Sequence, residues 1–366
     1  MVEHRLAKAR VAGSNPVSRS KSSRHIHCLA HYTDRFDDSR IRSISSMDDH
    51  VTFSDITKAA GLVRGIAHIT PVLTSGQLDD MIRGQVCLKC ENFQRTGAFK
   101  FRGAYHAVSR LTTSGAAGPV ATISSGNHGQ ALALAASLLG VSAEVVMPRP
   151  FSRAKYHAVL AYGGHVIESA DRRAGEEALQ ELLARGRAIH VHAFNDPRVI
   201  AGQGTIMLEF HGQVADLDML LAPVGGGGLL SGLCVAGHHL SPTLKIFACE
   251  PSGASDVAES IRLNRIIPMP APDTVADGLR TSLGTRTLPI LYAHLEGVLT
   301  VAEDEIFAAM RFAHERLKIV IEPSSAVALA PILRKEPAFA GKRVGIVLTG
   351  GNVDDNVFVR ALESGR

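Results

Sequence analysis

The sequence contains no tryptophan, few other aromatic residues and no long apolar run. A helix that crosses a membrane needs roughly 20 consecutive apolar residues, whereas a stretch such as 131–139 ends at Gly140. The sequence therefore predicts no membrane partner. Its hydrophobic content of 45% still allows a sizeable core in one or two domains.

Strong charge of one sign is also missing from most of the chain. The net charge is +4, but residues 1–46 carry nine Lys and Arg against four acids, or +5, which leaves about −1 for the rest. A protein that binds nucleic acid needs clustered basic residues on its folded domain. We therefore expect no nucleic-acid partner.

Residues 1–46 lack hydrophobic periodicity, and we expect them to form a disordered extension. Their first half is rich in Arg and Ser, as transit peptides are, but three aspartates follow closely, at Asp34, Asp37 and Asp38. A start codon assigned too early, with the functional start at Met47, is another explanation for the segment.

Cysteine is scarce, and the five cysteines are an odd number of which only Cys87 and Cys90 lie close together. The run Gln85–Cys90 alternates like a strand, in which residues three apart point to opposite faces. The two thiols would then diverge, which disfavours a zinc site or a redox pair. Reduced structural thiols indicate a cytoplasmic protein.

From Ser54 onward, short β-branched runs alternate with segments of helical character. Ser54 can cap a helix through Ile66, and Pro71 breaks it. We expect strands at 120–123, 144–147, 165–168, 219–224, 245–249 and 344–348. We expect helices at 130–139, 152–162, 174–185, 229–239 and 303–316. Such alternation predicts an α/β fold in which helices cover a parallel sheet.

One glycine-rich turn, Gly225–Gly228, follows a predicted strand and opens a predicted helix. Four glycines let the backbone approach a ligand closely and direct several N–H groups at one anion. The turn has neither the G-x-G-x-x-G spacing of a dinucleotide site nor the lysine of a triphosphate loop, so a single phosphate fits better. A flexible turn without a ligand is the alternative.

Three further sequence features lie at the predicted ends of strands or starts of helices: the loop 124–129, Thr349 and Lys100. The loop 124–129 could bind a carboxylate or lie against a flat ring, although Ser, Gly and Asn are equally typical of a helix cap. Thr349 offers a hydroxyl to a ring nitrogen. Lys100 lies between Phe99 and Phe101, and desolvation there would lower its pKa toward the neutral amine that attacks carbonyls. Position alone does not distinguish it from a surface lysine.

Five sequence blocks resemble, in the same order, those of the serine/threonine dehydratase and serine racemase group of the tryptophan-synthase-β-like (fold type II) pyridoxal-phosphate enzymes. The blocks are 91–103, 124–130, 201–205, 223–228 and 349–354. The resemblance implies two open, twisted, mostly parallel sheets with helices on both faces. The cofactor would lie in the cleft between a large domain, 54–118 and 198–362, and a small domain, 119–197.

By position, the resemblance also implies a role for each matching residue. Lys100 would be the Schiff-base lysine and take the α-proton, and Ser125 would exchange a proton on the opposite face. The cofactor would contact Phe99, Lys100, Asn127, Gly225, Gly226, Gly227, Gly228 and Thr349. The substrate would contact Ser124, Ser125, Gly126, Asn127 and His128. Thr349 replaces the Ser or Cys of many relatives, and a hydroxyl beside the pyridine nitrogen suits elimination better than transamination.

The implied activity is dehydration and deamination of a small β-hydroxy amino acid to a 2-oxo acid and ammonia. L-Threonine and L-serine are the expected substrates, with hydroxyaspartate and phenylserine as further ones. Ser125 also matches a serine that racemases use, so serine racemisation is an alternative. Residues 194–197 resemble the dehydratase version of their loop, which favours dehydration. The group also implies a homodimer.

The loop after the strand 245–249 resembles a divalent-cation loop of the same group. Glu250 and Asp256 would supply carboxylate oxygens and Ala254 a carbonyl oxygen, a set that suits Mg²⁺ or Ca²⁺. A helix-capping loop is the alternative. Two other functions stay open: β-replacement, although the residues around Lys100 differ from those enzymes, and a non-catalytic protein that binds phosphate or an amino acid.

Overall fold

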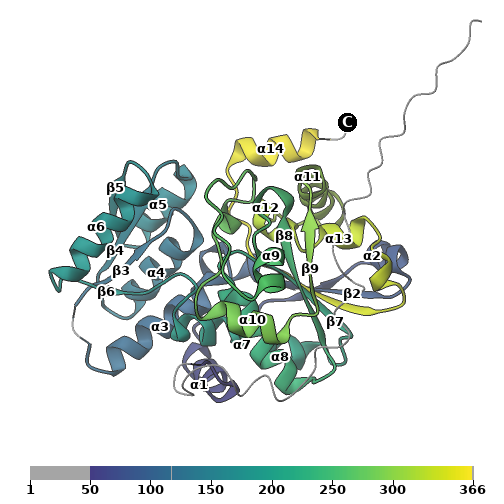
Figure 1. Cartoon of the computed structure of the whole chain (residues 1–366), viewed down its shortest axis with the longest axis horizontal. Helices are drawn as coiled ribbons and strands as arrows, with labels where there is room; N and C mark the ends of the chain where they lie inside the picture. The colour runs from purple at the N-terminus through teal and green to yellow at the C-terminus, as the bar shows by residue number, and fades with distance from the viewer. Residues whose placement is uncertain (1–49, 117, 365–366) are drawn as a thin grey trace, which may run out of the picture.

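The short apolar runs form two separate open sheets in the computed structural model, which describes residues 50–116 and 118–364 (Figure 1). The predicted disordered extension at 1–46 lies outside these residues. Among them, no helix combines the length and apolar character that crossing a membrane requires.

The larger sheet has six strands. In spatial order they are β1 (Val72–Thr74), β2 (Gln85–Cys90), β10 (Arg343–Leu348), β7 (Met219–Pro223), β8 (Lys245–Pro251) and β9 (Gly297–Val301). Only β1 pairs antiparallel, and the other pairings are parallel. The central strands are buried along nearly their whole length, as expected when helices cover both faces.

Alternate residues of these strands enter different cores on the two faces of the sheet. Cys87 and Leu220 pack on one face with α1 (Phe53–Val63), α7 (Pro197–Gln213), α8 (Gly228–Leu240), α9 (Val257–Leu263) and α10 (Thr287–His294). Cys90 and Leu221 pack on the other with α2 (Gly76–Ile82), α11 (Glu303–Phe312), α12 (Pro323–Ala326), α13 (Ala330–Leu333) and α14 (Asp355–Glu363). The predicted divergence of the Cys87 and Cys90 thiols is confirmed, and both are buried and free.

The smaller sheet has four parallel strands. Their order is β5 (His165–Ser169), β4 (Ala143–Pro148), β3 (Val120–Ile123) and β6 (Ile189–His190). Helices α4 (Asn127–Leu138) and α5 (Arg153–Ala161) pack on one face, and α6 (Arg172–Ala184) packs on the other. The predicted α/β class with two open, mostly parallel sheets is therefore confirmed.

Helix α3 (Lys100–Thr113) lies between the two sheets, where it packs against α4 on one side and α7 on the other (Figure 1). At one point of its contact with α7 the two backbones meet without a side chain between them. A Cβ on Gly202 of α7 would lie 2.6 Å from the Cα of Gly103 of α3. Further along α7, a Cβ on Gly232 of α8 would lie 2.5 Å from the backbone nitrogen of Gly204. The glycines of the block 201–205 are therefore helix-packing residues.

The predicted start and end of the first helix are wrong. Its N-cap is Thr52, whose hydroxyl accepts a hydrogen bond from the Asp55 N–H, while the Asp55 carboxylate accepts one from the Thr52 N–H. This reciprocal pair, a capping box, outcompetes Ser54, which lies inside the first turn. The helix ends at Val63 and not at Ile66.

Candidate active site

Lys100 is the first residue of α3, at the point where the chain leaves the larger sheet. The preceding segment is held to the end of β10, because the Phe99 N–H donates to the Thr349 carbonyl at 3.0 Å and Ala98 pairs with Gly350. The Lys100 Nζ donates to the Ala193 carbonyl at 3.0 Å and lies 5.0 Å from the centre of the Phe99 ring.

Burial lowers the pKa of Lys100 to about 8, although the nearby Glu322 acts in the opposite direction. Taking an ammonium out of water favours its neutral form. A larger share of this amine is therefore unprotonated near neutral pH than for a surface lysine, as a nucleophile or base requires. The structure agrees with the prediction that desolvation would lower this pKa.

The glycine turn 225–228 joins β7 to the start of α8. Within the described part of the chain, none of its four N–H groups donates a hydrogen bond. Gly227 has φ +87°, and a Cβ on Gly226 would lie 2.3 Å from the Phe194 ring. Glycine is therefore required for the path of this turn, whose free N–H groups at a helix N-terminus form a cradle for a phosphate.

Thr349 stands beside Lys100 at the end of β10. Its side chain is nearly buried, and its hydroxyl has no hydrogen bond among the described residues. An unbonded hydroxyl at this position could bond a ring nitrogen, and that role stays a prediction.

The loop 124–128 leads from β3 into α4. The Ser124 hydroxyl accepts hydrogen bonds from the N–H groups of Gly126 and Gly129, both at 3.2 Å, and so shapes the loop. Ser125 is exposed, and neither its hydroxyl nor its N–H is bonded within the described residues. Free N–H groups at the start of α4 suit a carboxylate.

The His128 side chain points away from that loop into the protein. It is buried, its Nε2 lies 3.1 Å from the Val191 carbonyl, and its Nδ1 has no partner among the described residues. Because a carbonyl only accepts, Nε2 carries the proton. Burial lowers the pKa of His128 to about 3, so the ring is neutral and could contribute to substrate binding only through its main chain.

Asn127 is bound to a glutamate that no sequence pattern had singled out. Its Nδ2 donates to both carboxylate oxygens of Glu322, at 2.7 and 2.9 Å, and its Oδ1 accepts from Asn352 at 2.9 Å. Glu322 is buried, and a Cβ on Gly350 would lie 2.4 Å from its Oε1. The available signal was a single acid after the apolar run 319–321 and before a proline.

Lys155, also missed from sequence, brings a second cation to this cluster. Its Nζ lies 2.5 Å from the Asp277 carboxylate and 3.7 Å from that of Glu322. The side chain of Lys155 is nearly buried, and a Cβ on Gly126 would lie 4.0 Å from its Nζ. The ammonium therefore lies under the loop 124–128, where it pairs with two carboxylates.

The predicted metal residues lie between β8 and α9. Glu250 is buried and accepts hydrogen bonds from the N–H groups of Val257 and Ala258, at 2.9 and 3.2 Å, so it caps α9. The Oδ2 atom of Asp256 is buried without a partner among the described residues, and Ala254 is buried beside them. The capping alternative thus describes Glu250, whereas the unpaired oxygen of Asp256 fits a cation.

Comparison with known proteins agrees with this arrangement. Residues 63–350 match the family model described as "Pyridoxal-phosphate dependent enzyme". The chain is 44% identical over 304 residues to a beta-hydroxyaspartate dehydratase of Paracoccus denitrificans, which covers 83% of this chain and 96% of the relative. It is 43% identical over 305 residues to a serine racemase of Arabidopsis thaliana, covering 82% and 92%.

Solved structures give the same result. The serine racemase of Dictyostelium discoideum superposes with a TM-score of 0.78 at 42% identity, covering 83% of this chain and 99% of that one. A solved threonine deaminase also superposes with a TM-score of 0.78, at 40% identity and with the same coverage. The chain therefore belongs to the fold type II pyridoxal-phosphate dependent enzymes, in the group that includes serine racemases, threonine dehydratases and hydroxyaspartate dehydratases.

Proposed function

We propose that this enzyme removes water and then ammonia from a small β-hydroxy amino acid, giving a 2-oxo acid. The observation that carries the proposal is the placement of Lys100: a desolvated amine at the start of α3, next to the segment that is bonded to Thr349. The 44% identity to a protein named as a dehydratase supports the same reaction.

The residues present fit pyridoxal phosphate. The free N–H groups of 225–228 would hold its phosphate, and Thr349 would bond its ring nitrogen. When bound, the cofactor supplies an electron sink for the negative charge that develops at the α-carbon. A hydroxyl at the ring nitrogen cannot hold a ring proton as a carboxylate does, which limits that sink and suits elimination.

The chain itself would move the protons. The Lys100 amine takes the α-proton, and the Ala193 carbonyl orients that amine from 3.0 Å. The free N–H groups at the start of α4 hold the substrate carboxylate, with the Lys155 ammonium beneath them. General acid and base assistance of this kind typically contributes about 10²- to 10⁴-fold in rate.

Amino-acid racemisation is the second candidate, and one observation favours it. The Ser125 hydroxyl is exposed and has no partner among the described residues, so it is free to exchange a proton. The 43% identity to a protein named serine racemase supports this reaction equally. Phe194 in the loop 194–197 favours dehydration, because the group's dehydratases resemble it there.

A divalent cation between β8 and α9 is part of the proposal. The buried, unpaired Oδ2 of Asp256 is the kind of oxygen ligand that Mg²⁺ and Ca²⁺ prefer. The Ala254 carbonyl and the Glu250 carboxylate, which already accepts two N–H groups of α9, would complete the set. A homodimer and a cytoplasmic location are also proposed, on the family resemblance alone. Sedimentation of the purified protein tests the dimer.

The deciding experiment measures 2-oxo acid release by the cofactor-loaded protein, with Mg²⁺ and with chelator. The substrates are the L and D forms of serine, threonine, threo-3-hydroxyaspartate and 3-phenylserine. Release from at least one L form is expected. Conversion of an L form to its D form without 2-oxo acid would establish racemisation instead, and silence in both assays would overturn the proposal.

Lys100→Ala should abolish turnover, because it removes the proposed base. Lys245→Ala is the matched control, since Lys245 is a half-exposed lysine paired with Glu296 far from the site. An active Lys100→Ala protein would rule out the assigned role of this lysine. A similar loss in both variants would show that the effect is not specific to the site.

A further inference from the structure

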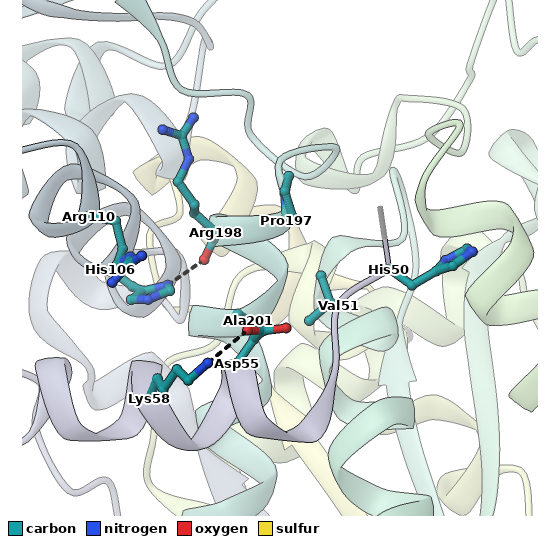
Figure 2. A pocket seen from close by; sticks show the side chains of 9 residues that line it. All are labelled: His50, Val51, Asp55, Lys58, His106, Arg110, Pro197, Arg198 and Ala201. Carbon is teal, nitrogen blue, oxygen red and sulfur yellow. Dashed lines mark hydrogen bonds and ion pairs between the residues drawn. The ribbon is translucent and has the colours of Figure 1, made fainter. Parts of the chain in front are cut away.

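A cavity of about 250 Å³ lies between the start of α1, the middle of α3 and the first turn of α7 (Figure 2). None of its lining residues belongs to the candidate active site. Lys58 and Arg110 reach it from α1 and α3, while Val51 and Ala201 give it an apolar floor. The cavity thus combines cationic walls with a small apolar surface.

The two cations have unused hydrogen-bond donors. The Lys58 Nζ lies 3.8 Å from Asp55 Oδ1, which is longer than a hydrogen bond, and the other oxygen of Asp55 is engaged by Thr52. The exposed Arg110 side chain lines the cavity without an ion pair to an acid in the described part of the chain. Two positive groups therefore face one cavity that holds a single, already bonded carboxylate.

Two further polar side chains of the lining, Arg198 and His106, add no free charge. The guanidinium of Arg198 is engaged by Asp196, with Nη2 to Oδ2 at 2.6 Å. The His106 Nδ1 lies 2.7 Å from the Arg198 carbonyl, so Nδ1 carries the proton (Figure 2). Burial lowers the pKa of His106, which keeps the ring neutral. Lys58 and Arg110 are therefore the lining cations whose hydrogen-bond donors are available to an anion.

We infer that this cavity binds a small organic anion. One carboxylate or phosphate group would lie between Lys58 and Arg110, and a short apolar part would lie on Val51 and Ala201. The proposed ligand is a separate small molecule.

The test is isothermal titration calorimetry on the full, cofactor-loaded chain, so that the glycine turn is already filled. Sodium phosphate and sodium succinate are titrated separately, each against sodium chloride of equal ionic strength. We expect saturable binding of at least one of them at one site per chain. The better ligand shows whether a phosphate or a carboxylate is preferred.

Lys58→Gln combined with Arg110→Gln should weaken binding at least about tenfold, because charge-assisted hydrogen bonds are lost. Arg64→Gln is the matched control, an exposed cation of the same region outside the cavity, and should bind as wild type does. If the double variant fails to fold, Arg110→Gln alone tests the site, since that side chain is exposed.

The inference fails if neither anion binds saturably, or if the cavity variants bind as tightly as wild type. The experiment measures anion binding and not turnover. Its result is therefore valid even if the proposed reaction is wrong.

Discussion

His192 shapes the loop that reaches Lys100. Its Nδ1 lies 3.2 Å from the Phe194 nitrogen and 3.0 Å from the Asn195 nitrogen, and both N–H groups donate to it. Nδ1 therefore carries no proton. Burial lowers the pKa of His192 to about 4, so the ring stays neutral at physiological pH and keeps this acceptor. The carbonyl of Ala193, which immediately precedes the bonded residues, is the one that orients Lys100.

We expect His192→Leu to lower kcat/KM by up to about 30-fold, because two main-chain hydrogen bonds worth about 1 kcal/mol each are lost. His192→Asn keeps an acceptor near the position of Nδ1 and should recover most of the activity. Steady-state kinetics of the two variants separate positioning from simple packing. Equal activity in both variants would contradict the positioning role.

The candidate site was only partly predictable from sequence. Lys100 and the turn 225–228 stand out because a local pattern surrounds them. Glu322 and Lys155 do not, since each acquires its role from partners more than 100 positions away: Asn127 for Glu322, and Asp277 for Lys155. The reverse error occurs at His128. Its local pattern suggested a substrate-binding side chain, but the pattern does not reveal that the ring turns into the protein.

Two histidines, His238 of α8 and His294 of α10, share one hydrogen bond between their rings. The Nε2 of His238 lies 2.9 Å from the Leu244 carbonyl and must donate, so its Nδ1 is an acceptor. The Nδ1 of His294 lies 3.1 Å from it and donates. Burial lowers the pKa of His294 to about 4, with His238 acting in the same direction. A second proton would set two N–H groups against each other.

The free energy of unfolding should therefore decrease as the pH falls from 6.5 to about 4. In that range His294 is protonated in the unfolded chain but still neutral in the folded protein, because folding lowers its pKa from 6.5 to about 4. The free energy of unfolding is therefore at its full value above pH 6.5 and decreases as the pH falls. At pH 5.5 the loss from this residue is on the order of 1 kcal/mol. Urea unfolding of wild type and His294→Gln at pH 7.5 and 5.5 measures it. An identical pH dependence in both proteins would exclude the pair as its source.

Secondary structure was predictable where burial imposes a periodic pattern. Strand β3 has the bounds expected for it, and β4, β5, β7, β8 and β10 differ from expectation by a residue or two. Strands β1, β6 and β9 were missed. β1 and β6 span three and two residues and leave no readable period. Helix α7 was missed because Gly202 and Gly204 lower its intrinsic helix propensity. The reason for these two glycines is visible only in the structure, where α7 packs closely against α3 and α8.

The two sheets are joined by polar contacts from α4 and α5 to the larger sheet and its loops. The Ser152 hydroxyl donates to Asp354 at 2.6 Å, and the Lys155 ammonium lies between Asp277 and Glu322. Burial raises the pKa of Glu322, while Lys155 acts against that rise. The carboxylate depends on this ammonium, since an isolated buried charge is costly.

Lys155→Met should lower the free energy of unfolding by about 3 kcal/mol, because it leaves the buried Glu322 carboxylate without its cation. Arg153→Met is the matched control, an exposed residue of the same helix, and should change stability by less than about 0.5 kcal/mol. Urea denaturation of both variants at pH 7.5 gives the difference. Equal values would mean that the ammonium does not stabilise the link.

The glycine contacts between α3, α7 and α8 have a consequence for how this enzyme can diversify. Lys100 begins α3 and the turn 225–228 ends at the start of α8, and α7 separates the two helices at backbone distance. These backbone contacts fix the distance between the Lys100 amine and the phosphate cradle, so changes of side-chain size in the three helices cannot adjust it. We expect changes of substrate to come from the loops 124–128 and 192–195, which lie outside these contacts. Laboratory evolution of this scaffold should therefore concentrate its libraries there and leave the three helices unchanged.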